Sequence, residues 1–465
     1  MHHLTVSNVL KGIKMGILVH SGTILTMHNR KIIRDGAVAI EGRTIVDVGK
    51  TRKLKRKYGR SYEKIDAKGK IVMPGLINTH QHAAMSLLRG YADDLPLQEW
   101  LEKWIWPAER HMSAHDIYVG SLLTAIESIT GGTTTVNTMY HYTFEENEAK
   151  AFAEAGLRGV IGHVCFSWRK KEDKEALWNL VKNWHNKANG TIRASVDPHA
   201  PYTVDPEYLK ELKETRNELN EKHGSKEVPI IWHIHIAETD DEPQKIQKAF
   251  KIKLKCGVMA YLDSLGVLDE QVIAAHCVAL TDEDIEIIKK RNVKVSHNPV
   301  SNLKLASGIS PVAQMLKKSI VVSLGTDSPS SNNSADMFET MKIAAILHKG
   351  INKNPTLMPA EKILEMATIE GAKALLWDKE IGSIDVGKKA DLAIINPKKP
   401  HLCPLYNEVS HLVYAAKATD VETVIINGKT IMENRKIISL NIEKVMREVE
   451  KVKSNLLSKL DINVK

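Results

Sequence analysis

Two histidines, His80 and His82, are separated by a single residue in a segment that could bind a metal ion. The strand-like segment Lys70-Ile71-Val72-Met73, with three apolar residues, precedes them. A plausible helix start, Ala83 to Gly90, follows, so the sequence predicts that both histidines lie where a strand ends. Alternate side chains of an extended chain point to the same face, and two such imidazoles can bind one metal ion about 2 Å away. In a chain with 20 histidines, the pair is equally compatible with surface residues in a loop. The metal hypothesis therefore needs further ligands.

Polar residues recur downstream where short β-branched segments end. The segments are 133–136, 159–162, 192–196, 230–234, 272–275, 293–296 and 320–324, and the polar residues at their ends are Asn137, His163, His199, His235, His276, His297, Asn298 and Asp327. One buried histidine on a strand is more often a core residue, but repeated placement at strand ends favours a common site. The geometry of such a site selects His80, His82, His235 and Asp327 as metal ligands. Three imidazoles and one carboxylate suit Zn²⁺, one ion per chain, and Fe²⁺ or Mn²⁺ are alternatives.

A carboxylate, Glu238, follows His235 by three residues. At the end of a strand it can face the same cavity without binding the metal, and it can then transfer protons. The alternative is an exposed glutamate in the first turn of a helix, where the helix dipole favours a negative charge. Beside the predicted metal ligands, we favour the catalytic interpretation.

The elements that would position these residues are eight strands alternating with helices over residues 75–379. This pattern predicts a (β/α)8 barrel of the TIM type, in which the active site lies at the carboxyl ends of the strands. Short strand patterns also occupy residues 15–74 and 380–440, so we expect both ends of the chain to build one small β-sandwich. Residues 1–14 form an N-terminal extension, and residues 441–465 contain apolar positions at three- and four-residue spacing, which predicts a closing amphipathic helix.

Composition excludes several other classes of protein. Hydrophobic residues make up 43% and charged residues 26%, and no apolar run reaches the roughly 20 residues that span a bilayer, so we expect no membrane segment. The net charge of +9 raises the possibility of nucleic-acid binding, but its densest run, residues 52–57, has one nearby tyrosine and resembles a solvated surface helix. Four widely spaced cysteines and the lack of a secretion signal favour the cytoplasm. We also expect a homo-oligomer.

The combination of motifs resembles the amidohydrolase superfamily, in the branch that contains adenosine-type and s-triazine hydrolases, and most closely the 5′-methylthioadenosine/S-adenosylhomocysteine deaminases. The resemblance covers almost the whole chain from Met15. It rests on residues 74–82, Pro198-His199-Ala200-Pro201-Tyr202, His276-Cys277, His297-Asn298-Pro299, Ser301-Asn302-Leu303-Lys304 and Gly325-Thr326-Asp327. It implies one zinc ion, and residues 192–197 contain no lysine that could bridge a second metal.

The resemblance also implies roles for individual residues. It makes His80, His82, His235 and Asp327 ligands, Glu238, His276 and Asp327 catalytic, and Glu109 the carboxylate that binds the ribose. It makes His199 a substrate contact, and it aligns His163 with a substrate-pocket arginine of relatives. Trp100, Trp104 and Trp106 could line the pocket, although the spacing of the first two favours helix packing.

The implied reaction is hydrolytic deamination of 5′-substituted adenosines, small-molecule nucleosides, to inosine analogues and ammonia. Asp327 would accept a proton from water, Glu238 would protonate ring N1, and His276 would orient the attacking oxygen. Two alternatives remain open. One is a deaminase or chlorohydrolase of guanine or s-triazine rings, and the other is a catalytically inactive protein on the same fold.

Overall fold

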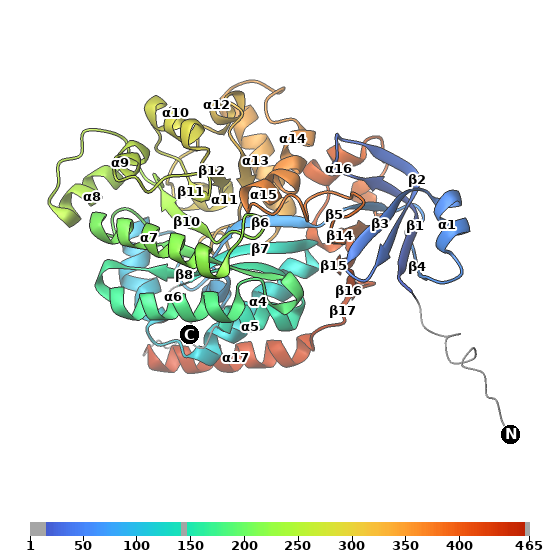
Figure 1. The fold of residues 1–465 in the computed structure, drawn as a ribbon, viewed down its shortest axis with the longest axis horizontal. Coiled ribbons are helices and arrows are strands. Elements are labelled where there is room, and N and C mark those ends of the chain that lie inside the picture. Colours follow the sequence, from blue (N-terminus) through green and yellow to red (C-terminus); the bar gives the residue numbers. More distant parts are fainter. Residues whose placement is uncertain (1–14, 141–146, 461–465) are drawn as a thin grey trace.

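Eight parallel strands form a barrel at the centre of the protein (Figure 1). The computed structural model describes residues 15–140 and 147–460. In chain order the strands are β6 (Leu76–Gln81), β7 (Thr133–Tyr140), β8 (Arg158–Cys165), β9 (Ile192–Pro198), β10 (Ile231–Ile236), β11 (Val272–His276), β12 (Lys294–His297) and β13 (Val322–Leu324). Each pairs with the next, and hydrogen bonds from Asp327 N to His80 O (2.9 Å) and from Thr79 Oγ1 to Leu324 O (2.9 Å) join the last strand to the first. The predicted barrel is confirmed.

Helices cover the outside of the barrel (Figure 1). Several begin at residues whose side chains cap free backbone N–H groups, as Ser113 does for Asp116 N and Thr281 for Asp284 N. The longer helices are α4 (Ala114–Thr130), α5 (Asn147–Ala155), α6 (Lys170–Trp184), α7 (Pro206–His223), α8 (Glu242–Phe250), α9 (Val258–Ser264), α10 (Asp282–Arg291), α13 (Met337–Ile351) and α14 (Ala360–Met366). The shorter ones are α2 (Leu97–Glu99), α3 (Trp106–Glu109), α11 (Pro299–Lys304), α12 (Val312–Lys317) and α15 (Ile369–Ala374), the π-helix η4 (Trp100–Ile105), and the 3₁₀ turns η3 (Ala83–Leu88), η6 (Ser167–Arg169), η7 (Ala188–Gly190), η8 (Pro400–Leu402) and η9 (Ala418–Asp420).

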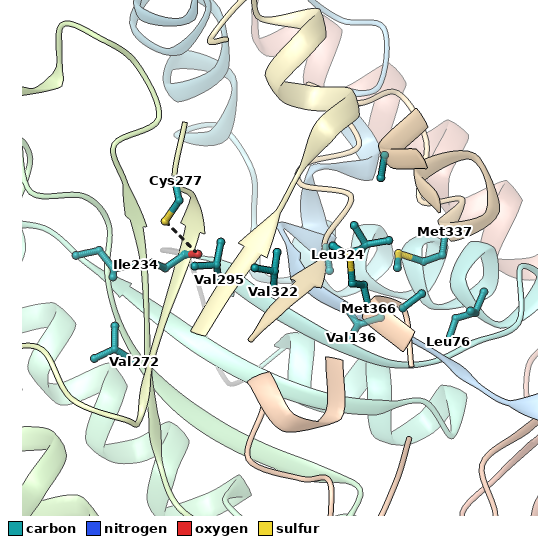
Figure 2. Packing of buried hydrophobic residues seen from close by; sticks show 14 of the residues in the cluster. Leu76, Val136, Ile234, Val272, Cys277, Val295, Val322, Leu324, Met337 and Met366 are labelled. Atoms are coloured by element: carbon teal, nitrogen blue, oxygen red, sulfur yellow. Dashed lines mark hydrogen bonds between the residues drawn. The ribbon is translucent and has the colours of Figure 1, made fainter. Parts of the chain in front are cut away.

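The main hydrophobic core lies between the strands and these helices. Figure 2 shows part of it, with Ile234, Val295 and Leu324 from the strands and with Met337 and Met366 from helices α13 and α14. Because successive side chains of a strand point to opposite faces, an outward-facing apolar residue has inward-facing neighbours on both sides. In β10, two histidines flank Ile234, so the core packing of that strand directs both imidazoles into the barrel.

Both ends of the chain contribute to a second, mixed sheet, as predicted. Among the described residues its strands are β1 (Ile17–Leu25), β2 (Ile32–Glu41), β3 (Thr44–Lys50), β4 (Glu63–Asp66), β5 (Ile71–Pro74), β14 (Leu392–Ile395), β15 (Val421–Ile426), β16 (Lys429–Glu433) and β17 (Lys436–Ile437). Strand β5 pairs with β14, which joins the N-terminal and C-terminal halves of this sheet. Helix α1 (Thr51–Tyr58), which carries the basic run, and helix α16 (Glu408–Tyr414) are inserted between its strands along the chain.

The strand that leads to His80 differs from the prediction. Residues Ile71–Pro74 belong to the mixed sheet, and a separate strand, β6, carries His80 in the barrel. Gly75 separates the two strands at a point of very close packing, where a Cβ atom would lie 2.1 Å from the side chain of Thr134. The predicted strand at residues 70–73 is present, but its assignment to the barrel was wrong. Both segments are apolar, and only their pairing partners distinguish them.

The last helix, α17 (Ile442–Lys459), runs along the outside of the barrel beside α4 and α5 (Figure 1). Asn441 caps it by accepting a hydrogen bond from Lys444 N (2.9 Å), and Val445 packs against Leu122 and Ile126 of α4. This confirms the predicted amphipathic helix. Within the described ranges, no helix is both long and apolar enough to cross a lipid bilayer.

Candidate active site

The four predicted ligands converge at the carboxyl ends of the barrel strands. His80 and His82 come from β6 and the residue that follows it, His235 from β10, and Asp327 from the loop after β13. Asp327 Oδ1 lies 3.2 Å from His80 Nε2 and 3.3 Å from His82 Nε2, and the Nε2 atoms of His82 and His235 are 3.2 Å apart. Two donors that bind one zinc ion at about 2.05 Å with a tetrahedral angle lie about 3.3 Å from each other. These three separations fit donors that share one metal ion. Two overlapping groups, His80 with His82 and Asp327, and His80 with His235 and His276, each have donor atoms within 4.8 Å of one another.

Hydrogen bonds behind the ligands fix which nitrogen of each ring faces the site. Nδ1 of His82 lies 2.9 Å from Met139 O, and Nδ1 of His235 lies 2.6 Å from His199 O. A carbonyl oxygen can only accept, so each Nδ1 carries the proton and each Nε2 keeps its lone pair for a metal. Burial lowers the pKa of His80 and His235 well below the usual histidine value, which keeps both rings neutral.

The carboxylate of Asp327 uses its two oxygens differently. Oδ1 faces the imidazoles, whereas Oδ2 accepts hydrogen bonds from Ser301 Oγ (2.6 Å) and Ser331 Oγ (3.2 Å). Burial by itself would raise the pKa of Asp327, but the imidazoles of His80 and His82 close to Oδ1 outweigh it and hold that pKa well below the usual range. Asp327 is therefore ionised, as a metal ligand must be.

Glu238 lies in the loop between β10 and α8, and its side chain is buried. It lies outside the first turn of α8, which begins at Glu242. The helix-dipole interpretation therefore does not describe its position. Its Oε1 atom is 3.9 Å from His276 Nδ1. Burial raises the pKa of Glu238, so the protonated, hydrogen-donating form is favoured more than for an exposed glutamate.

A hollow opens beside these groups. The helical segment of α2, η4 and α3 forms part of its wall and contributes mainly apolar side chains and one carboxylate, Glu109. Glu109 is only 1% exposed. The lining residues include His82, His235, Glu238, His276 and Asp327 from the strand ends and the loops that follow them, and Leu97, Trp100, Leu101, Ile105, Trp106 and Glu109 from the helical segment.

Comparison with known proteins agrees with this arrangement. Residues 71–431 match the model of the amidohydrolase family. The chain belongs to the amidohydrolase family. A 5-methylthioadenosine/S-adenosylhomocysteine deaminase of Thermoanaerobacter pseudethanolicus is 48% identical over 454 residues, which cover 96% of this chain and 100% of that protein. A 5'-deoxyadenosine deaminase of Methanosarcina acetivorans is 44% identical over 448 residues, which cover 95% of this chain and 99% of that protein.

Solved structures show the same fold. A zinc-bound adenosine deaminase from Xanthomonas campestris has a TM-score of 0.88 and 31% sequence identity, and the match covers 96% of this chain and 99% of that one. A zinc-bound atrazine chlorohydrolase of Arthrobacter aurescens has a TM-score of 0.84 at 20% identity, with 94% of this chain and 100% of that one covered. The second comparison supports the fold alone. Like its relatives, this amidohydrolase is a hydrolytic enzyme.

The amidohydrolase brings together most, but not all, of the residues expected from its sequence. Glu109 lines the hollow, and the half-buried ring of His199 lies 5.0 Å from that of His235. His163 is different, since its Nε2 atom faces Asp173 Oδ1 at 3.1 Å and the residue does not line the hollow that the described residues form. Of the three tryptophans considered, Trp100 and Trp106 line the hollow, whereas Trp104 is 38% exposed.

Several side chains behind the site were not assigned a role from sequence. Glu242 accepts hydrogen bonds from Ala237 N (3.1 Å) and Glu238 N (2.9 Å), and so fixes the turn that aims Glu238 at the hollow. His233 Nε2 lies 2.9 Å from Nδ1 of His80. The signal available in the sequence was a second acidic residue, Glu242, four residues after Glu238. A buried carboxylate usually has a hydrogen-bond partner, and here the partner is the backbone of the turn.

Proposed function

We propose that this amidohydrolase deaminates 5′-substituted adenosines, such as 5′-methylthioadenosine, by hydrolysis at C6 of the purine. Water adds its oxygen to C6, the C6–N6 bond breaks, and the products are the inosine analogue and ammonia. The names of its relatives and the zinc-bound adenosine deaminase structure support this class of substrate. The observation that carries the proposal is the buried Glu109 carboxylate in the same hollow as Glu238 and the metal-donor set.

Zinc, one ion per chain, is the metal that we propose for the site. His80, His82, His235 and Asp327 would hold it, because the separations of 3.2 to 3.3 Å recorded between their donor atoms fit ligands of one ion. A bound zinc ion would supply a water molecule whose pKa is lowered toward about 7.

The side chains of the site account for each proton in the reaction. Asp327 accepts the first proton of the attacking water, while buried Glu238 donates its proton to N1 of the purine, which makes C6 more electrophilic. His276 accepts a hydrogen bond from the hydroxyl that is adding to C6 and so orients it. Asp327 then passes its proton to the departing amino group, which leaves as ammonia. The remaining proton of the former water returns to Glu238, so both carboxyl groups regain their starting states.

Glu109 would distinguish a nucleoside from other aromatic rings. A carboxylate can accept hydrogen bonds from both hydroxyls of the ribose cis-diol, whereas a triazine or a free purine base has no such pair. Because Glu109 is buried, its charge is best stabilised when both hydroxyls are bound. The apolar side chains of the same wall suit the nonpolar faces of adenine.

The proposal is tested by measuring ammonia release from a panel of substrates with the purified, zinc-loaded enzyme. The panel contains 5′-methylthioadenosine, 5′-deoxyadenosine, S-adenosylhomocysteine, adenosine, free adenine, guanine and a chlorinated s-triazine. We expect the highest kcat/KM for a 5′-substituted adenosine. Faster release of ammonia from guanine, or of ammonia or chloride from the triazine, would assign the enzyme to another substrate class.

A further inference from the structure

We infer that Asn302 is a positioning residue that selects the reactive nitrogen of His276. The Oδ1 atom of Asn302 lies 2.7 Å from His276 Nδ1, and both residues are only 1% exposed. The motif Ser301-Asn302-Leu303-Lys304 is one of those that carry the family resemblance, yet none of its residues takes part in the reaction proposed above. The geometry gives this motif a function. The role of His276 itself rests on the proposed function.

The chemistry of the two side chains determines the tautomer. An amide oxygen can only accept a hydrogen bond, so His276 Nδ1 must carry a proton when it faces Asn302 Oδ1. In the neutral ring, Nε2 then holds the lone pair and is the nitrogen left for the reacting centre. The rings of His80 and His235 are 5.2 and 5.4 Å from that of His276, so the imidazole stands directly beside the metal-donor set.

The backbone restricts the ring further. His276 and Cys277 both have left-handed conformations, with φ values of 72° and 49°, although neither is glycine. Hydrogen bonds from Cys277 N to Ile236 O (3.0 Å) and from Val278 N to Ala237 O (2.8 Å) tie this turn to the end of β10. Non-glycine residues in this conformation are found where the surrounding structure enforces it, often at functional sites. The turn fixes the position of the imidazole, and Asn302 fixes the orientation of its proton.

The residue next to Asn302 acts on the other side of the site. Ser301 Oγ donates to Asp327 Oδ2 (2.6 Å), which leaves Oδ1 as the oxygen that faces His80 and His82. Lys304 Nζ, at the end of the same helix, pairs with Asp93 and bonds to Asn333 in two neighbouring loops. The short helix α11 therefore holds two groups of the reaction, His276 and Asp327, in a fixed relation to each other.

The test compares three variants of the full-length, zinc-loaded enzyme. Asn302→Leu removes the acceptor at similar volume, Asn302→Asp keeps an oxygen at the same place, and Asn220→Leu is the matched control. Asn220 hydrogen-bonds to the backbone N–H and C=O of Ile230. Ile230 lies just before β10, at the end of that strand opposite to the one that carries His235. We expect Asn302→Leu to lower kcat by about ten- to a hundredfold, with a smaller change in KM and unchanged zinc content. Asn302→Asp should recover most of kcat, and Asn220→Leu should lower Tm without lowering kcat.

The tautomer is read directly by ¹⁵N NMR of the imidazoles, with the His276 signals assigned by their loss in His276→Gln. We expect a protonated Nδ1 in the wild type and loss of that fixed state in Asn302→Leu. An unprotonated Nδ1 in the wild type, or a kcat of Asn302→Leu within about threefold of the wild type, would overturn the inference. Equal loss in Asn302→Leu and Asn302→Asp would also overturn it. Absence of ammonia release from every nucleoside would overturn the proposed function instead, because the ¹⁵N measurement needs no substrate.

Discussion

Replacing Glu109 by alanine should remove the preference of the enzyme for ribose over 2′-deoxyribose. Glu109 is 1% exposed in a wall whose other side chains are mainly apolar, and we propose that its carboxylate accepts hydrogen bonds from the ribose hydroxyls. When a 2′-deoxy substrate binds, one of these bonds is missing and a buried charge is left less well paired. That loss is about 1 to 3 kcal/mol, or roughly ten- to a hundredfold in kcat/KM.

The assay is a two-by-two comparison of kcat/KM for 5′-methylthioadenosine and its 2′-deoxy analogue in the wild type and in Glu109→Ala. The wild type should have a roughly ten- to a hundredfold higher kcat/KM for the ribose substrate. The variant should lose activity toward the ribose substrate and treat the two sugars almost equally, because it has no carboxylate to be left unpaired. Such a cycle isolates the interaction between Glu109 and the hydroxyl from other effects of the substitution.

A matched control is Glu102→Gln. Glu102 is an exposed residue in η4, the helical element directly before α3 and Glu109. It should keep the wild-type preference for ribose. Zinc content is measured in every variant. It should not change in Glu109→Ala, because Glu109 is not among the proposed metal donors. A wild type with no preference between the sugars, or a Glu109→Ala variant that retains the full preference, would refute the ribose-binding role of Glu109.

Three further predictions concern the metal, the general acid and stability. Elemental analysis should find about one transition-metal ion per chain, and a chelator should abolish activity until zinc is restored; two ions per chain would contradict the single site. Glu238→Gln should keep zinc and substrate binding but lower kcat by roughly 100- to 10,000-fold, because an amide cannot transfer the proton; near-normal turnover would remove Glu238 from the mechanism. Burial raises the pKa of Glu148 in α5 from 4.5 to about 8, so stability should fall progressively as the pH rises from 4.5 to about 8, because folding holds this carboxyl in its neutral form. Glu148→Gln should therefore raise Tm at pH 9 more than at pH 6, and an equal change at both values would show that Glu148 does not titrate in this way.

The sequence determined those features that depend on neighbouring residues. The alternation in His233-Ile234-His235 specifies a strand with one apolar face and one face of imidazoles, whatever that strand packs against. Parallel strands joined by helices have their carboxyl ends on the same edge, so residues at those ends meet once the barrel forms. For this reason the convergence of His80, His82, His235 and Asp327 could be predicted from strand ends alone.

Tertiary structure decided the partners of each side chain. His163 has the same kind of position on its strand as His235, but Asp173 from the following helix lies beside its ring. The apolar segments on either side of Gly75 are alike in composition, yet one joins the mixed sheet and the other joins the barrel. Asn302 meets His276 across 26 residues of chain. These outcomes depend on packing between distant segments, because a hydrogen bond requires its two atoms to lie within about 3 Å and no local pattern specifies that distance.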